Sequence, residues 1–423
     1  MDEHSAKLLS TLIGAQAAHL RDAIPAGSTA RGASLGHLAE LLIDSAEQQA
    51  ASLMVQLASS EATARPALGR KLTRCRARLE VTHLILADYA GDVLRQDLPT
   101  GLLCLIDTLV SQLLPPSVDP LVHLSEQRMY STLSLNGRAA WLLNENSLAT
   151  NVGVVVFNLP ALDPGNVLYA PILAHEVAHT LVSQEDLVGG LYRGADLQAL
   201  DKVFARELSR SGAAADPAEW KQRLSEWIQE LLCDALATRL TGPSFILASA
   251  AFLPATSMTG SLSSHPFPVD RLDLCASQLR DLGWGDHLAV NYPTICDWLQ
   301  QLSTDAPAST EPQETFLRQA ITLLSGDIAR IAALHVEDSL RPEAYDVISA
   351  ELNELVAAGI PPSRLAGGIP SSWDLVLAGW QTAIATRGGA PMTIAAAAED
   401  RPFNEFLLKS LEIAKITEVW DES

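Results

Sequence analysis

A His-Glu-x-x-His pattern near the middle of the chain combines residue types that bind metals and transfer protons. His175 and His179 are four positions apart, so on an α-helix both imidazoles project from one face and can share a tetrahedral metal ion. Glu176 follows His175 directly and can act on a water bound to that metal. The alternative is two packed core histidines, but burying two imidazoles and a carboxylate in one turn is costly unless they are paired or metal-bound. The pattern therefore favours a metal site.

Such a site needs a third protein ligand, and two glutamates are candidates. Glu185 lies ten residues after His175, but no turn residue separates it from His179, so a continuing helix would carry it away from the metal. Glu230 and Asp234 are four residues apart in a second helical segment and share one face of it. One carboxylate can bind the metal while the other accepts the free N–H of a ligating imidazole. Apolar neighbours leave little polar face for an exposed carboxylate pair, so Glu230 is the better candidate.

The combined pattern, His175-Glu176-x-x-His179 followed by a helical Glu230-x-x-x-Asp234, resembles the gluzincins. This group of zinc peptidases includes thermolysin and the CAAX-protease/heat-shock peptidase family. The resemblance implies a zincin-like core in which His175, His179 and Glu230 bind zinc. It also implies that Glu176 is the general base and that Asp234 is the hydrogen-bond partner of His175. Unlike the CAAX-protease group, this sequence has no uncharged apolar run of the ~20 residues that a membrane span needs.

A third element follows the glutamate segment. His265-Pro266, with Arg271 six residues after the histidine, is similar to the His-Pro…Arg element of the CAAX-protease group. The proline restricts the backbone near His265, whose imidazole can then donate to the oxyanion of a tetrahedral intermediate. Arg271 can brace a carboxylate near the site. An ordinary turn at the head of a helix is the alternative interpretation of this element.

The remaining sequence predicts the elements that must position these residues. Residues 166–183 and 216–240 are expected to be the two helices that carry the motifs, and the first is apolar almost all round, which is typical of a buried helix. Asn151–Phe157 is the clearest strand, short and β-branched. A substrate peptide could lie along this strand if it forms a sheet edge. The predicted fold class is mainly α with a small β-sheet (α+β), with a zincin-like catalytic core embedded in helical domains.

Changes in composition along the chain predict four segments. These are a helical N-terminal domain (1–116), a zincin-like metallopeptidase core (117–302), a linker rich in Ser, Thr and Pro (303–313) and a helical C-terminal domain (314–423). The flanking helical domains resemble no family.

Charge and cysteine content exclude several classes of function. The chain has 50 acidic and 29 basic residues, a net charge of −21, which argues against a nucleic-acid partner and against an anionic membrane surface. Basic residues cluster between Arg65 and Arg78, where a solvated helix face is a better interpretation than a site for an acidic partner. The five cysteines form no Cys-x-x-Cys pair, so no disulfide framework is indicated and a cytoplasmic location fits best. The acidic N-terminus does not resemble a signal peptide.

These features together predict a zinc-dependent peptidase that hydrolyses peptide bonds of a protein or peptide substrate. Zn²⁺ would be the cofactor, and Glu176 the general base. The alternative is a regulatory or interaction protein that uses the metallopeptidase-like core as a scaffold, with little or no turnover. The intact Glu176 favours the enzyme, because a scaffold needs no base beside the metal. The helical flanks leave room for a protein partner in either case.

Overall fold

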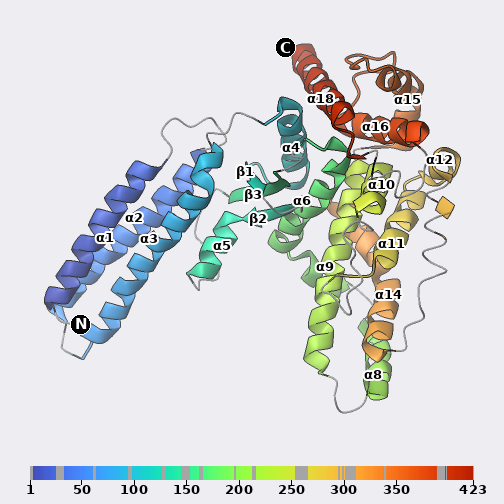
Figure 1. The fold of residues 1–423 in the computed structure, drawn as a ribbon. Coiled ribbons are helices and arrows are strands. Elements are labelled where there is room, and N and C mark those ends of the chain that lie inside the picture. Colours follow the sequence, from blue (N-terminus) through green and yellow to red (C-terminus); the bar gives the residue numbers. More distant parts are fainter. Residues whose placement is uncertain are drawn as a thin grey trace. The chain divides into compact units, whose positions relative to one another are not determined.

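Helices form most of the chain in the computed structural model, and they accompany one small three-stranded sheet (Figure 1). The predicted fold class, mainly α with a small β-sheet, is therefore confirmed. No helix within the described ranges is both long enough and apolar enough to cross a membrane. The described residues are 3–24, 33–60, 63–93, 98–125, 130–143, 153–161, 165–194, 197–211, 216–252, 265–293, 296–297, 300, 311–337, 340–387, 396 and 398–422.

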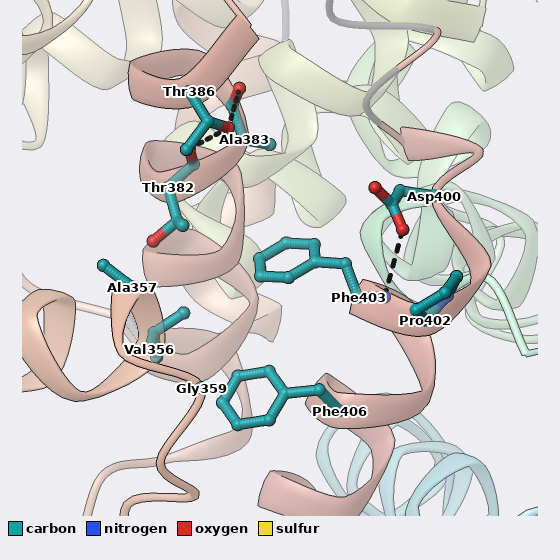
Figure 2. A pocket seen from close by; sticks show the side chains of 10 residues that line it. All are labelled: Val356, Ala357, Gly359, Thr382, Ala383, Thr386, Asp400, Pro402, Phe403 and Phe406. Carbon is teal, nitrogen blue, oxygen red and sulfur yellow. Dashed lines mark hydrogen bonds between the residues drawn. The ribbon is translucent and has the colours of Figure 1, made fainter.

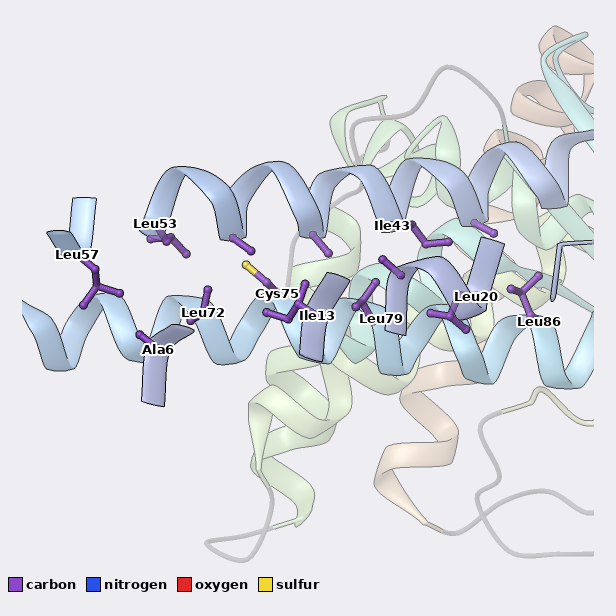
Figure 3. Packing of buried hydrophobic residues seen from close by; sticks show 14 residues of the cluster. Ala6, Ile13, Leu20, Ile43, Leu53, Leu57, Leu72, Cys75, Leu79 and Leu86 are labelled. Carbon is purple, nitrogen blue, oxygen red and sulfur yellow. The ribbon is translucent and has the colours of Figure 1, made fainter. Parts of the chain in front are cut away.

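Three long helices dominate the first of two compact units, which comprises Met1–Asp97 and Pro115–Leu162. The helices α1 (Glu3–Ala23), α2 (Ala33–Ser59) and α3 (Arg65–Val93) pack against one another. Apolar residues at helical spacing bring their side chains into one core, which is nearly all aliphatic (Figure 3). This core includes Ala6, Ile13, Leu20, Ile43, Leu53, Leu57, Leu72, Cys75, Leu79 and Leu86.

The sheet also belongs to the first unit and has the strand order β1-β3-β2. β3 (Gly153–Pro160) runs parallel to β1 (Val118–Ser125) and antiparallel to β2 (Ser131–Ser134). The expected strand therefore lies in the centre of the sheet, and it is paired on both sides from Val155 to Asn158. The possibility that a substrate peptide pairs with this strand as a sheet edge is thus wrong. β1 and β2 escaped prediction because Asp, Pro and His interrupt the first and the second has only four residues.

The second unit comprises Leu98–Leu114 and Asp163–Ser423 and is helical throughout its described part. Its long helix α9 (Pro217–Thr241) packs against α6 (Ala170–Gln184), α10 (Pro243–Phe252), α11 (Pro268–Asp281) and α14 (Pro312–His335). The other described helices of at least seven residues in this unit are α4 (Thr100–Leu113), α7 (Leu187–Gly194), α8 (Leu197–Ser211), α12 (Gly285–Asn291), α15 (Pro342–Ala357), α16 (Ser372–Arg387) and α18 (Arg401–Glu422).

The two units do not coincide with the segments expected from composition. α4, which was expected to end the N-terminal domain, packs against α6 and α18 in the second unit. Its buried face consists of leucine, isoleucine and valine side chains, and such a face does not encode which apolar partner covers it. Most of the expected linker, residues 303–310, lies outside the described residues.

Local signals set both ends of α9 as the sequence predicted. The Asp216 side chain accepts a hydrogen bond from the backbone N–H of Ala218 at 2.8 Å, and Pro217 occupies the first turn. At the other end Gly242 adopts a φ of 59°, where a Cβ atom would lie 2.8 Å from the Leu340 side chain. Only glycine satisfies both the backbone conformation and the space at this position.

α4 and α18 approach so closely at Gly101 that no side chain fits between them. A Cβ atom at this position would lie 2.0 Å from the carbonyl oxygen of Leu408. We expect Gly101→Ala to lower the free energy of unfolding by about 1–3 kcal/mol, because the helices must separate. Gly326→Ala in α14 is the matched control: no atom lies within 4 Å of its Cβ position, so the substitution should stabilise the helix by about 1 kcal/mol. Chemical denaturation measures both changes, and an unaltered stability of Gly101→Ala would contradict the close approach.

Candidate metal centre

α6 carries the two histidines into the interior of the second unit. Leu173, Val177 and Ala178 are at most 1% exposed, and His175 is 5% exposed. The helix begins at Ala170, after the 3-10 turn η2 (Val167–Tyr169), and not at residue 166 as expected. The Asn166 side chain makes no capping hydrogen bond, and its amide nitrogen donates to the carbonyl of Ala398 at 2.8 Å.

The His-Glu-x-x-His residues lie close together, as the helical spacing predicted. His175, Glu176 and His179 each offer one potential ligand atom, and these atoms lie within 4.8 Å of one another. The Nε2 atoms of the two imidazoles are 3.2 Å apart. In the absence of a metal this distance allows one ring to donate a hydrogen bond to the other.

α9 brings Glu230 to the same two nitrogen atoms. Its Oε2 lies 3.4 Å from Nε2 of His175, and its Oε1 lies 3.5 Å from Nε2 of His179. Glu230 is 8% exposed, and its buried Oε2 has no hydrogen-bond partner. Its carboxylate therefore faces both imidazoles at distances longer than a good hydrogen bond, and Nη2 of Arg271 lies 3.9 Å from its Oε2.

Asp234, one helical turn after Glu230, contacts the opposite edge of the first imidazole. Nδ1 of His175 donates to Oδ1 of Asp234 at 2.8 Å, and Arg271 donates to both carboxylate oxygens from Nε and Nη2, each at 2.7 Å. The two-pronged contact of a guanidinium with a carboxylate is among the strongest polar interactions in proteins. Because Nδ1 of His175 is bonded to Asp234, the opposite nitrogen, Nε2, is directed toward Glu230.

His265 lies at the margin of this cluster. Its Nε2 is 3.5 Å from Oε1 of Glu230, and its side chain is 37% exposed. It is thus more accessible than His179, at 25%, and His175, at 6%. It lies just before α11. Glu185, the other candidate third ligand, is an exposed residue that caps the C-terminal end of α6. α6 continues without a turn from His179 to Gln184, so Glu185 does not join the cluster.

The buried charges shift one another's pKa values in opposite directions. Burial alone would lower the pKa of His175, but the Asp234 carboxylate raises it to about 9. Burial, together with the charge on His175, lowers the pKa of His179 to about 4. Burial raises the pKa of the Glu176 carboxyl to about 7. Burial also disfavours a charged Asp234, yet the Arg271 guanidinium holds the pKa of that carboxyl well below its usual range.

Two further residues touch the histidines and were missed by sequence reasoning. Nε2 of Gln229 lies 3.3 Å from Nδ1 of His179, so the second imidazole also has a polar partner on α9. The Phe245 ring of α10 stacks on His175, with 6.2 Å between centroids and 9° between planes. Gln229 is adjacent to Glu230, but neighbours on a helix point about 100° apart, so adjacency alone gave no reason to select it. Phe245 had no signal beyond its apolar character.

A separate region of this unit contains a largely apolar pocket. A pocket of about 550 Å³ opens between α15, α16 and α18, and Phe403 and Phe406 point into it (Figure 2). Asp400 is the only charged residue among those that line it. The pocket thus offers no ligand set comparable with the histidine cluster. Its lining residues are Val356, Ala357, Gly359, Thr382, Ala383, Thr386, Asp400, Pro402, Phe403 and Phe406.

The raised pKa of Glu176 predicts a pH-dependent stability of the metal-free protein. Because the folded-state pKa of about 7 exceeds the ordinary value of 4.5, the folded protein retains this proton to higher pH than the unfolded chain does. The corresponding stabilisation is present below pH 4.5 and is lost as the pH rises through 7. In EDTA, we expect Glu176→Gln to be more stable than wild type by about 3 kcal/mol at pH 8, with little difference near pH 4.5.

Urea unfolding at several pH values measures this difference. The exposed Glu185→Gln, at the end of the same helix, is the matched control and should have little effect on stability at either pH. A stability difference between Glu176→Gln and wild type that does not vary with pH would contradict the prediction.

Comparisons with protein-family models, with curated protein sequences and with solved structures returned no match. The chain is a mainly helical protein in which a His-Glu-x-x-His segment on a buried helix faces two carboxylates of a second helix and an arginine of a third.

Proposed function

We propose that the chain is a zinc-dependent peptidase of the gluzincin type, with His175, His179 and Glu230 as the metal ligands. The spacing of three groups carries this proposal. The Nε2–Nε2 distance is 3.2 Å, and the Glu230 oxygens lie 3.4 and 3.5 Å from the two nitrogens. Ligand atoms at the corners of a tetrahedron with bonds of about 2.0–2.1 Å are about 3.3 Å apart. The separations therefore suit a zinc ion at the centre of this group.

The surroundings of these atoms also suit a cation. Glu230 is nearly buried, its Oε2 has no hydrogen-bond partner, and the Arg271 guanidinium lies 3.9 Å from that oxygen, so a cation bound closer would stabilise the carboxylate further. The Asp234 carboxylate takes the N–H at Nδ1 of His175 and thereby keeps Nε2 available as a ligand. Gln229 can serve His179 in the same way, since rotation of its amide exchanges donor and acceptor.

In the proposed hydrolysis, each side chain of the site would have a separate role. Bound zinc would polarise the substrate carbonyl and increase the acidity of the attacking water. The Glu176 carboxylate would take a proton from that water and deliver it to the amine of the leaving product. His265, whose side chain is 37% exposed, would donate to the oxyanion that develops on the substrate carbonyl. Asp234 and Arg271 would hold the His175 ring in place throughout.

The ligand assignment predicts how tightly the wild type and two variants bind zinc. We expect about one zinc per wild-type chain. Glu230→Gln should weaken zinc binding by at least about 10–100-fold, because it replaces an anionic ligand with a neutral one. The exposed Glu185→Gln serves as the control and should bind zinc like the wild type. Competition with a chelating dye measures the affinities. Wild-type affinity in Glu230→Gln combined with loss in Glu185→Gln would reverse the assignment of the third ligand.

The assignment of the base predicts an inactive protein that retains its metal. Glu176→Gln should bind zinc but lose about 10²–10⁴-fold in turnover, because the proton acceptor is gone. Incubation of a proteome-derived peptide library with each zinc-loaded protein, followed by mass spectrometry of new termini, measures cleavage. Equal cleavage by both proteins would contradict the role of Glu176. Zinc binding without cleavage by the wild type would instead support the scaffold alternative.

A further inference from the structure

The turn that carries His265 is held from both sides by aromatic and charged contacts. Phe267, two residues after His265, packs edge-on against Trp227 of α9, with 5.8 Å between ring centroids and 88° between planes. Trp227 is fully buried. On the other side, the guanidinium of Arg318 on α14 lies over the Phe267 ring, 4.8 Å from its centroid. The Phe267 ring is thus enclosed between α9 and α14.

Arg318 is itself fixed by carboxylates. Its Nε lies 3.3 Å from Oδ2 of Asp270 and 3.5 Å from Oε1 of Glu314. Asp270 belongs to the first turn of α11, directly before Arg271. The guanidinium therefore contacts both the Phe267 ring before α11 and the Asp270 carboxylate in its first turn, and both interactions favour a cation at this position.

α14 provides a rigid base for this contact. Phe316, two residues before Arg318, is 1% exposed and stacks on Trp220 of α9, while Phe204 of α8 meets the same ring edge-on. Leu317 is fully buried. Because the neighbouring side chains are packed in the core, the backbone at Arg318 has little freedom to follow a moving turn.

We infer that Arg318 is a positioning residue for His265, acting through Phe267. By holding the Phe267 ring against Trp227, it sets the position of a turn whose histidine lies 3.5 Å from Glu230. This inference rests on the proposed function, since it assigns His265 to the oxyanion of the reaction. It also gives α14, which follows the expected linker, an indirect role in the site, because Arg318 does not touch the ligand atoms.

The inference predicts a change in turnover without a change in metal content. Arg318→Gln should lower kcat about 10–100-fold with KM changed less than about threefold, because a displaced His265 affects the transition state more than substrate binding. Arg318→Lys retains a cation over the ring and should recover most of kcat. Arg330→Gln on the same helix is the matched control: the Arg330 side chain is 53% exposed and pairs with Asp327, so kcat should be unchanged.

A readout that does not need activity keeps this test separate from that of the proposed function. Hydrogen–deuterium exchange of peptides that cover residues 265–275 should be faster in Arg318→Gln than in wild type, while peptides from α6 and α9 exchange alike. Phe267→Leu, which removes the ring but keeps an apolar side chain, should reproduce both effects, also if Arg318→Gln fails to fold. Unaltered exchange in this segment in either folded variant would overturn the inference. Faster exchange with no peptide cleavage by the wild type would support the role in holding the turn and reject the peptidase proposal.

Discussion

Asp234 is a buried carboxylate on which the arrangement of the histidine site depends. It is 1% exposed, and a carboxylate left alone in such a place would cost several kcal/mol. His175 on α6 and Arg271 on α11 offset that cost through hydrogen bonds of 2.7–2.8 Å. Because its partners come from two other helices, one side chain of α9 connects three helices and fixes the orientation of one imidazole at the same time.

The same constraint explains why the site combines strong and weak polar contacts. The outer edge of His175 is held by a charged partner, whereas Glu230 faces the inner edges of both imidazoles at distances of 3.4 and 3.5 Å. Tight contacts around the periphery and longer contacts at the centre would suit the proposed metal ion. The aromatic contacts of Phe245 and Phe267 extend this support to α10 and α14. The second unit is thus built to hold polar groups in fixed positions in an apolar interior.

Some features of the site followed from the sequence because helical geometry acts over short distances. The four-residue spacing of His175 and His179, and likewise of Glu230 and Asp234, selected pairs of side chains on one helix face. The absence of a turn residue after His179 predicted that the helix continues past the histidines, and α6 does run to Gln184, with Glu185 exposed at its end. By contrast, the sequence left open whether the strand at 151–157 is a sheet edge, and the structure places it between β1 and β2. No local pattern in the strand itself indicates its neighbours.

The sequence by itself determined the helical class, the ends of α9 and the identity of the groups able to do chemistry. All of these depend on residues within a few positions of one another. Only the tertiary structure decided that Glu230 meets both imidazoles, that Gln229 and Phe245 contact them, and that α14 reaches the His265 turn through Arg318. These contacts join residues tens of positions apart on helices with similar apolar faces. Packing over the whole unit determines which faces meet, and helical periodicity does not indicate the partner of a given face.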